Sequence, residues 1–203
     1  MESLRKVTGV AAPLMRINID TDQIIPALFL GGTDAKGYGA NLFNGWRFLP
    51  DGSPNPDFIL NREPYTKAEV LLADRNFGCG SSRERAPWAL REWGFRAIVA
   101  PSFGGIFFNN CYRNGILPVE LPIEQVRELV AEVEASKGEG RVSVDLETQT
   151  VTAPSGKTYA FTAPTTLRQM LLDGMDEIAV TLSKKAELEA FRSADRERRP
   201  WAY

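Results

Sequence analysis

The residues best suited to do chemistry lie together in one short stretch of the chain. Residues 75–84 read Arg-Asn-Phe-Gly-Cys-Gly-Ser-Ser-Arg-Glu; an apolar run precedes them at 68–73, and a helical pattern follows at 83–93. This order predicts a strand, a glycine turn and the start of a helix. A helix start favours an anion, and an arginine can bind a carboxylate or phosphate through two hydrogen bonds. We therefore interpret the stretch as an anion-binding active-site turn.

The same stretch also has a purely structural interpretation, since glycines end strands and serines cap helices. Gly78 and Gly80 would let a ligand approach the backbone, and Ser81 precedes Glu84 by three residues, the spacing of a capping box. Capping needs only one serine, however, and this turn adds a second serine, an arginine and a cysteine. A dinucleotide fingerprint would need a glycine where Arg83 stands, and the Gly-Lys-Ser/Thr of a P-loop is missing.

The composition is that of a globular protein with one well-buried core. The chain has 203 residues, of which 43% are apolar and 25% are charged, and a formal net charge of -2. This charge gives no reason to expect nucleic acid or an acidic membrane as a partner. No run approaches the ~18 apolar residues of a membrane span, and the first residues lack the apolar core of a signal peptide. We expect a cytoplasmic protein.

The lack of histidine restricts the chemistry most. It excludes Ser-His-Asp and Cys-His catalysis and histidine metal sites within this chain. The two cysteines, Cys79 and Cys111, are too few for a zinc site of cysteine and histidine or for an iron-sulfur cluster. If the chemistry needs such a metal, a partner must bring it. We expect Cys111 to be a core thiol, and a cysteine hydrolase built on Cys79 would lack an activating histidine.

The N-terminal part offers one strand and one polar cluster. Residues 7–15 are mostly apolar and predict a first strand. Asp20, Thr21 and Asp22 follow, and two interpretations stay open for them: turn and helix-cap chemistry, or a polar cluster beside the active-site turn.

Residues 31–67 show no lasting helical or strand period. Six glycines and four prolines interrupt this segment, and aromatic residues are scattered through it. Disordered segments are poor in aromatic residues, and a long loop inside a compact domain is usually functional. We therefore expect a functional loop region that covers the substrate or docks a partner.

The alternation of strands and helices over residues 68–137 indicates β-α-β units and a partly parallel sheet. We expect strands at 97–101 and 116–121, and a short helix or loop at 103–114. The clearest helix begins at Pro122, because proline suits the first helical position. Its apolar stripe, which should face the core, consists of Val126, Leu129, Val130 and Val133.

The C-terminal part changes character twice. Residues 142–161 alternate between apolar and polar types and predict a β meander, and residues 165–172 predict a short helix. Residues 182–203 form a charged, helical tail that is either a solvated face or a partner-binding helix. The residues thus predict an α/β fold with a mixed sheet, flanking helices and a C-terminal β meander.

Several stretches resemble one known family. They are residues 18–26, 42–48, 76–84, 86–90 and 114–118. In this order they are similar to the small subunits of bacterial 3-isopropylmalate dehydratase, the leucine-pathway branch of the aconitase superfamily. The resemblance implies a single domain over residues 1–203 with the aconitase swivelling-domain fold, a β/β/α arrangement.

The resemblance also implies a two-chain hydro-lyase. No cofactor would be bound by this chain, and a separate large subunit would hold a [4Fe-4S] cluster, as a heterodimer or a larger assembly. The substrate would be a small dicarboxylate, 2-isopropylmalate, isomerised to 3-isopropylmalate by loss and re-addition of water. A subunit acting on citramalate, or a non-catalytic regulatory relative, are the alternatives.

Roles for single residues follow from the resemblance as well. Ser81 would be the catalytic base. The substrate-binding residues would be Gly80, Ser82, Arg83, Asp20, Thr21 and Asp22. The loop that sorts substrates would contain Phe29, Leu30, Gly31 and Gly32, without an arginine for a third carboxylate, which favours an apolar side group. The chain departs from the family at Arg85, where histidine is usual, and arginine cannot exchange a proton near neutral pH.

Overall fold

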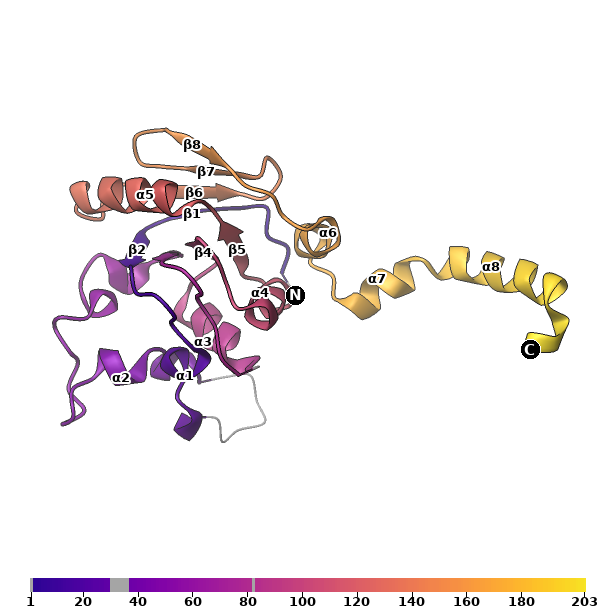
Figure 1. Cartoon of the computed structure of the whole chain (residues 1–203), viewed down its shortest axis with the longest axis horizontal. Coiled ribbons are helices and arrows are strands. Elements are labelled where there is room, and N and C mark those ends of the chain that lie inside the picture. The colour runs from indigo at the N-terminus through magenta and orange to yellow at the C-terminus, as the bar shows by residue number, and fades with distance from the viewer. Residues whose placement is uncertain (1, 30–36, 82) are drawn as a thin grey trace.

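Two four-stranded sheets, one parallel and one antiparallel, form the frame of the described part of the chain. The structure is a computed structural model that describes residues 2–29, 37–81 and 83–203 (Figure 1). The parallel sheet has the order β2 (Ala11–Leu14), β3 (Val70–Ala73), β4 (Ala97–Ala100), β5 (Leu117–Glu120). The antiparallel sheet has the order β1 (Lys6–Gly9), β6 (Val142–Asp145), β7 (Thr150–Thr152), β8 (Thr158–Ala160). The predicted α/β class, partly parallel pairing and meander are confirmed, with the two kinds of pairing in separate sheets.

The single strand predicted at residues 7–15 is wrong in one respect. β1 and β2 divide this run between the two sheets, and only Val10 lies between them. The Val10 carbonyl accepts hydrogen bonds from the backbone amides of Glu69 and Val70, at 3.0 and 3.1 Å. Because both strands bury apolar side chains, the sequence gives no polar residue to mark the crossing from one sheet to the other.

The parallel strands are apolar along nearly their whole length because both of their faces are buried. The exception is the exposed Glu120 at the end of β5. Val70 and Leu72 of β3 point into a core shared with the antiparallel sheet and with α5 (Ile123–Ala135). Leu71 and Ala73 point into a second core on the opposite face, which includes α1 (Thr21–Ile24) and α3 (Arg85–Trp93). α5 and the antiparallel sheet lie on one side of the parallel sheet, and α1 and α3 on the other (Figure 1). The predicted apolar stripe of α5 is buried as expected.

The helix expected at 83–93 begins two residues later, at Arg85. Pro87 is therefore its third residue, within the first turn, where a missing amide proton costs no helical hydrogen bond. Glu84 occupies the N-cap position and its side chain caps nothing, so the expected capping box of Ser81 and Glu84 is wrong. The helix after β4 is α4 (Gly105–Arg113), inside the range predicted for it.

Residues 37–67 are packed against the domain and contain short helices. These are η2 (Gly39–Asn41), α2 (Asn44–Arg47), η3 (Ile59–Asn61) and η4 (Tyr65–Lys67). Tyr38, Phe43 and Phe58 are buried in the second core. Helices of three or four residues are too short to give a sequence period, which is why this part resembled a loop. Before it, η1 (Ala27–Phe29) ends at the last described residue of that stretch.

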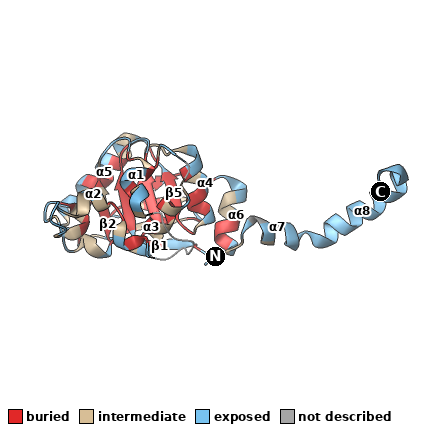
Figure 2. Ribbon diagram, turned by 90° about the horizontal axis from the view of Figure 1, so that it is seen from below, coloured by how far each residue is buried: buried red, intermediate tan, exposed pale blue. Residues whose placement is uncertain are grey.

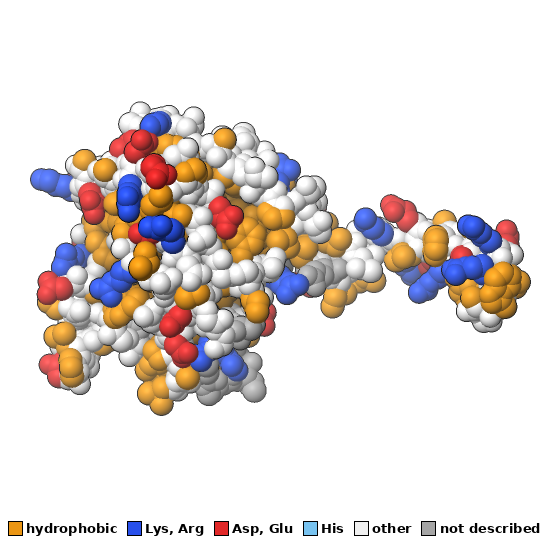
Figure 3. All heavy atoms as spheres, in the orientation of Figure 1, with side chains coloured by type: hydrophobic (Ala, Val, Ile, Leu, Met, Phe, Trp, Pro, Cys, Tyr) orange, Lys and Arg blue, Asp and Glu red, His pale blue; other side chains and the backbone are white. Residues whose placement is uncertain are grey.

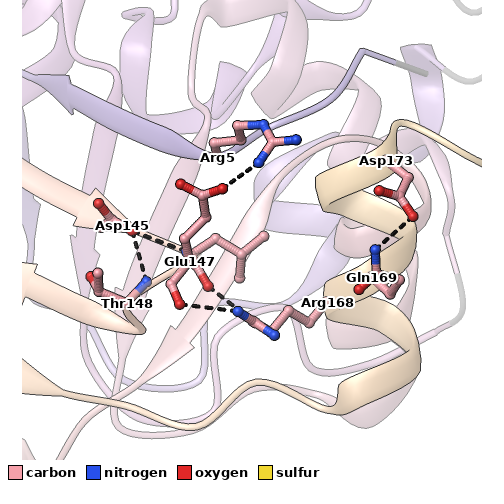
Figure 4. Close-up of polar contacts among 8 residues, drawn as sticks. Arg5, Asp145, Glu147, Thr148, Arg168, Gln169 and Asp173 are labelled. Carbon is pink, nitrogen blue, oxygen red and sulfur yellow. Dashed lines mark hydrogen bonds and ion pairs between the residues drawn. The ribbon is translucent and has the colours of Figure 1, made fainter.

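The meander is tied to α6 (Thr165–Asp173) by one arginine (Figure 4). Arg168 donates hydrogen bonds to the carbonyls of Leu146 and Glu147, both at 3.0 Å. In the turn after β6, the Asp145 carboxylate accepts the amides of Glu147 and Thr148. The bond from Thr148 is the main cause that lowers the pKa of Asp145. These bonds fix the meander against the rest of the domain.

The charged tail is helical, as predicted, and projects from the domain as an arm (Figures 1 and 2). It consists of α7 (Glu177–Ser183), α8 (Lys185–Arg198) and η5 (Pro200–Ala202). Hydrophobic side chains lie between the charged ones along it (Figure 3), among them the exposed Phe191 and Trp201. Asp195 holds the tip together by accepting hydrogen bonds from Arg199 and Tyr203. In the described ranges, no helix is both long and apolar enough to cross a bilayer.

Replacing a residue of the second core should destabilise the fold strongly. Leu71 is fully buried, so Leu71→Ala should lower the free energy of unfolding by about 3 kcal/mol, from lost burial plus the cavity left behind. Urea unfolding followed by circular dichroism measures this change. Leu28 is 85% exposed, and the matched variant Leu28→Ala should change the free energy by less than about 0.5 kcal/mol. Equal effects of the two substitutions would contradict the described packing.

Candidate active site

The predicted active-site turn lies at the carboxyl ends of the parallel strands, where ligands bind in open α/β sheets. Residues 77–79 continue the pairing of the sheet between residues 19–21 on one side and residues 102–104 on the other. The backbone hydrogen bonds, from amide to carbonyl, are Gly78 to Ile19 (2.7 Å), Thr21 to Cys79 (2.9 Å), Phe77 to Ser102 (3.1 Å) and Gly104 to Phe77 (2.9 Å). Three loops are thus fixed side by side.

The two glycines of the turn differ in their surroundings. Gly78 is buried with φ +71°, and a Cβ added there would lie 2.2 Å from Cγ of Phe107. A side chain is excluded at Gly78 by conformation and packing, and Gly78 also lines the cavity described below, so ligand access to its backbone stays a prediction. Gly80 has φ +92° and is exposed, and an added Cβ would lie 3.4 Å from Cβ of Asp20. Of these two glycines, Gly80 is the one that is exposed to solvent.

A cavity of about 110 Å³ lies beside the turn. It is lined by Thr21, Gly78, Gly80, Ser81, Arg83, Gly104, Gly105, Ile106 and Phe107. The helix whose start borders this cavity is α4, and its N-cap residue Gly104 has no capping side chain. The amides of a first helical turn have no partner within the helix, so they favour an anion here. The sequence predicted an anion at the start of the helix after Arg83, but the helical residues that line this cavity belong to the start of α4.

Residues 102–105 were not singled out from the sequence. The signal for them was present, because Gly104 and Gly105 stand between a buried strand and a helix. Glycines at the carboxyl end of a parallel strand are the places where a ligand can approach a helix start closely.

The Asp20 to Asp22 segment combines both interpretations that the sequence left open. Oδ1 of Asp20 accepts the amide of Gln23 at 2.7 Å, and Oε1 of Gln23 accepts the amide of Asp20 at 2.9 Å, which is a capping box for α1. The Thr21 hydroxyl donates to the carbonyl of Ser81 at 2.9 Å. The segment therefore caps a helix and also lies against the turn.

Arg83 forms a two-bond ion pair with Asp22. Nη1 contacts Oδ1, and Nη2 contacts Oδ2 at 2.8 Å. The Arg83 side chain is 18% exposed and that of Asp22 is 53% exposed. The pair fixes the plane of the guanidinium at the edge of the cavity, and these two residues are 61 positions apart in the chain. Sequence reasoning selected both residues but not their pairing.

The two cysteines differ in their surroundings. Burial, with a smaller contribution from Asp20, raises the pKa of the half-buried Cys79 thiol, which therefore stays protonated at neutral pH. This disfavours a cysteine nucleophile at the turn. Cys111 is buried in the second core, as expected, and its burial raises its pKa well above the ordinary value. Among the described residues, no group of three or more His, Cys, Asp or Glu side chains is arranged to hold a metal ion.

Some of the expected site residues lie outside the described residues. They are Ser82, Leu30, Gly31 and Gly32. Phe29 is half-buried and packs against the second core, and Ser81 is exposed at the mouth of the cavity. The Arg85 side chain contacts Tyr38, to whose hydroxyl its Nε donates at 3.2 Å.

Two family models match adjoining parts of the chain. The family model "Aconitase C-terminal domain" matches residues 1–124, and the model LeuD_N matches residues 127–162. The 3-isopropylmalate dehydratase small subunit of Cupriavidus necator is 52% identical, and that of Neisseria meningitidis (strain Z2491) is 49% identical; each alignment covers 100% of this chain and 99% of the relative.

A solved structure is similar as well. The crystal structure of 3-isopropylmalate dehydratase (leuD) from Methanocaldococcus jannaschii has a TM-score of 0.65 at 25% identity, covering 92% of this chain and 99% of that one. Identity near 50% over the full length, together with a family model that spans most of the chain, is decisive. The chain belongs to the family of 3-isopropylmalate dehydratase small subunits, components of an aconitase-related hydro-lyase.

Proposed function

We propose that this chain supplies the base and one carboxylate-binding group of an active site that a cluster-bearing large subunit completes. The observation that supports this is the convergence of Ser81, Arg83, Thr21 and the start of α4 on one cavity. The reaction is the isomerisation of 2-isopropylmalate to 3-isopropylmalate by loss of water and its re-addition with the hydroxyl on the neighbouring carbon.

The size of the cavity supports a split site. Pockets that enclose a small molecule usually measure about 300–1,000 Å³. The cavity beside Ser81 measures about 110 Å³, and Gly80, Ser81 and Ile106 of its lining are exposed. A second chain placed over this rim would supply the missing walls and would exclude water from the reacting groups.

The residues of this chain are also consistent with an iron-sulfur cluster that is held by the large subunit. The chain has no histidine, its Cys79 thiol is protonated and its Cys111 is buried, so a [4Fe-4S] cluster would be held by the large subunit. When bound there, the cluster supplies a Lewis acid for the substrate hydroxyl and a carboxylate. The task left for this chain is to hold the other carboxylate and to move the carbon-bound proton.

Ser81 is the proposed base, and it needs help to act as one. A hydroxyl resembles water, whose pKa is about 15.7, and a helix start contributes at most ~2 kcal/mol, or roughly 1.5 pKa units. The α4 amides and the Arg83 charge act on the same cavity, but only the assembled site adds the remaining stabilisation of an alkoxide. Ser81 of the isolated chain is therefore inert in this proposal.

Arg83 is the proposed ligand of a substrate carboxylate, together with the Ser82 hydroxyl. A guanidinium has five N–H donors, and Asp22 takes two of them, which leaves donors directed elsewhere. Asp22 then orients Arg83, while Asp20, Thr21 and Gly80 hold the backbone around it. The segment with Phe29, Leu30, Gly31 and Gly32 would face the apolar group of the substrate; citramalate, with a smaller group, is the nearest alternative substrate.

Removing the Ser81 hydroxyl should abolish most turnover. We expect Ser81→Ala to lower kcat at least ~100-fold, the low end for loss of a general base, with unchanged binding of the large subunit. Anaerobic turnover of 2-isopropylmalate by the mixed subunits, followed through the absorbance of the unsaturated intermediate, measures this. Neither subunit alone should be active. Ser155→Ala, in an exposed turn of the meander, is the matched control; an active Ser81→Ala enzyme would favour the regulatory alternative.

Replacing the fork of Arg83 by a single ammonium should weaken substrate binding. Arg83→Lys keeps the charge but cannot make two parallel bonds to Asp22 and to a substrate carboxylate together. We expect kcat/KM for 2-isopropylmalate to fall by about 10- to 100-fold, mostly through KM. Arg62 also pairs with an aspartate, Asp57, but on the exposed surface, so Arg62→Lys should leave the kinetics unchanged. Equal kinetics of the two variants would exclude Arg83 from carboxylate binding.

A further inference from the structure

One face of α3 holds the segment that follows residues 30–36. Arg85, Trp88 and Glu92 are spaced three and four positions apart, so they share this face. Nε of Arg85 donates to the Tyr38 hydroxyl at 3.2 Å, and the Trp88 ring lies 5.8 Å from the Tyr38 ring, centroid to centroid. Tyr38 itself is 4% exposed, so it is fixed between α3 and the core.

Glu92 binds the backbone on both sides of Tyr38. Its Oε1 accepts the amide of Gly37 at 2.9 Å, and its Oε2 accepts the amide of Gly39 at 2.7 Å. The approach at Gly39 is close, since an added Cβ would lie 2.8 Å from Cβ of Glu92. Gly37 has φ +87°, a conformation that other residues rarely adopt. One carboxylate thus sets the position and the direction of the chain at this point.

The same helix begins beside the proposed catalytic turn. α3 starts at Arg85, two residues after Arg83, and Glu92 lies in its last turn. A helix is rigid, so the distance between the turn and residues 37–39 is set by α3 and by the Glu92 contacts. We propose that Glu92 is a positioning residue that fixes residues 37–39 against α3, and thereby helps to set the preference for 2-isopropylmalate over smaller 2-alkylmalates. This inference rests on the proposed function.

Loss of the Glu92 carboxylate should shift residues 37–39 without unfolding them. Arg47 holds η2 independently, because its Nη1 donates to the carbonyls of Ala40 and Leu42 at 3.1 and 3.2 Å. Glu92 is exposed and belongs to neither buried core. In Glu92→Gln, the amide nitrogen cannot accept a hydrogen bond, so one of the two backbone amides loses its acceptor.

The test uses the reconstituted two-chain enzyme and compares 2-isopropylmalate with citramalate. For Glu92→Gln we expect the ratio of the two kcat/KM values to fall about fivefold, through a higher KM for 2-isopropylmalate and with kcat within about twofold. This fold-change fits the net loss of one ordinary hydrogen bond. Gly39→Ala, which pushes on the same contact while keeping the carboxylate, should shift the ratio in the same direction. Glu124→Gln, the same change at an exposed position of α5, should leave it unchanged.

Amide hydrogen exchange of Gly37 and Gly39 in the isolated chain gives a readout that needs no substrate. We expect at least one of these amides to exchange about fivefold faster in Glu92→Gln, and unchanged exchange would overturn the proposal. An unchanged ratio of the two kcat/KM values, in an enzyme whose subunits bind normally, would also overturn the proposal. A loss of subunit binding at a constant ratio would overturn it as well, because Glu92 would then be an interface residue. If the wild-type enzyme turned over neither substrate, the proposed function would fail, and the exchange rates would still decide the contact.

Discussion

The site depends on one constraint, the parallel pairing that continues beyond the ends of β2, β3 and β4. Without the bonds that join residues 77–79 to residues 19–21 and 102–104, the three loops would be independent. With them, the Ser81 turn, the α1 cap and the start of α4 have fixed relative positions. The buried strands below hold this pairing in place, since both faces of the sheet are covered. The geometry of the site therefore depends on the stability of the core.

The two aspartates of the α1 segment have the same side chain but different partners. The Asp20 side chain caps its own helix, where it is the acceptor of the capping box. Asp22, two positions later, pairs with Arg83 instead. Between them, Thr21 is 2% exposed and bonds to the Ser81 carbonyl. One short helix thus orients the arginine and supports the serine, although it has only four residues.

The sequence predicts the parts of the fold whose signals are local. The apolar run of β3, the alternation in the meander and the stripe of α5 each follow from which faces are buried, and all three are confirmed. The start of α3 was missed because a Ser-x-x-Glu spacing is also compatible with a turn, and here two positive-φ glycines and the Thr21 bond hold Ser81 outside the helix.

Long-range features were harder to predict. The Asp22 to Arg83 pair and the Glu92 contacts join residues more than fifty positions apart, and no period or motif encodes such pairs. The packing of residues 37–67 was missed for a related reason. Its short helices are stabilised by aromatic side chains in the second core and not by their own propensity.

The chemical types of the groups in this site determine how its charge depends on pH. A hydroxyl, backbone amides and an arginine do not change charge near neutral pH, and the chain has no histidine. The nearest thiol, Cys79, has a raised pKa and stays neutral as well. The electrostatic field that this chain presents to a substrate is thus constant through the neutral range. In the proposed two-chain enzyme, any change of charge near pH 7 must then come from the substrate or from the partner chain, so the pH dependence of turnover in this range would be set there.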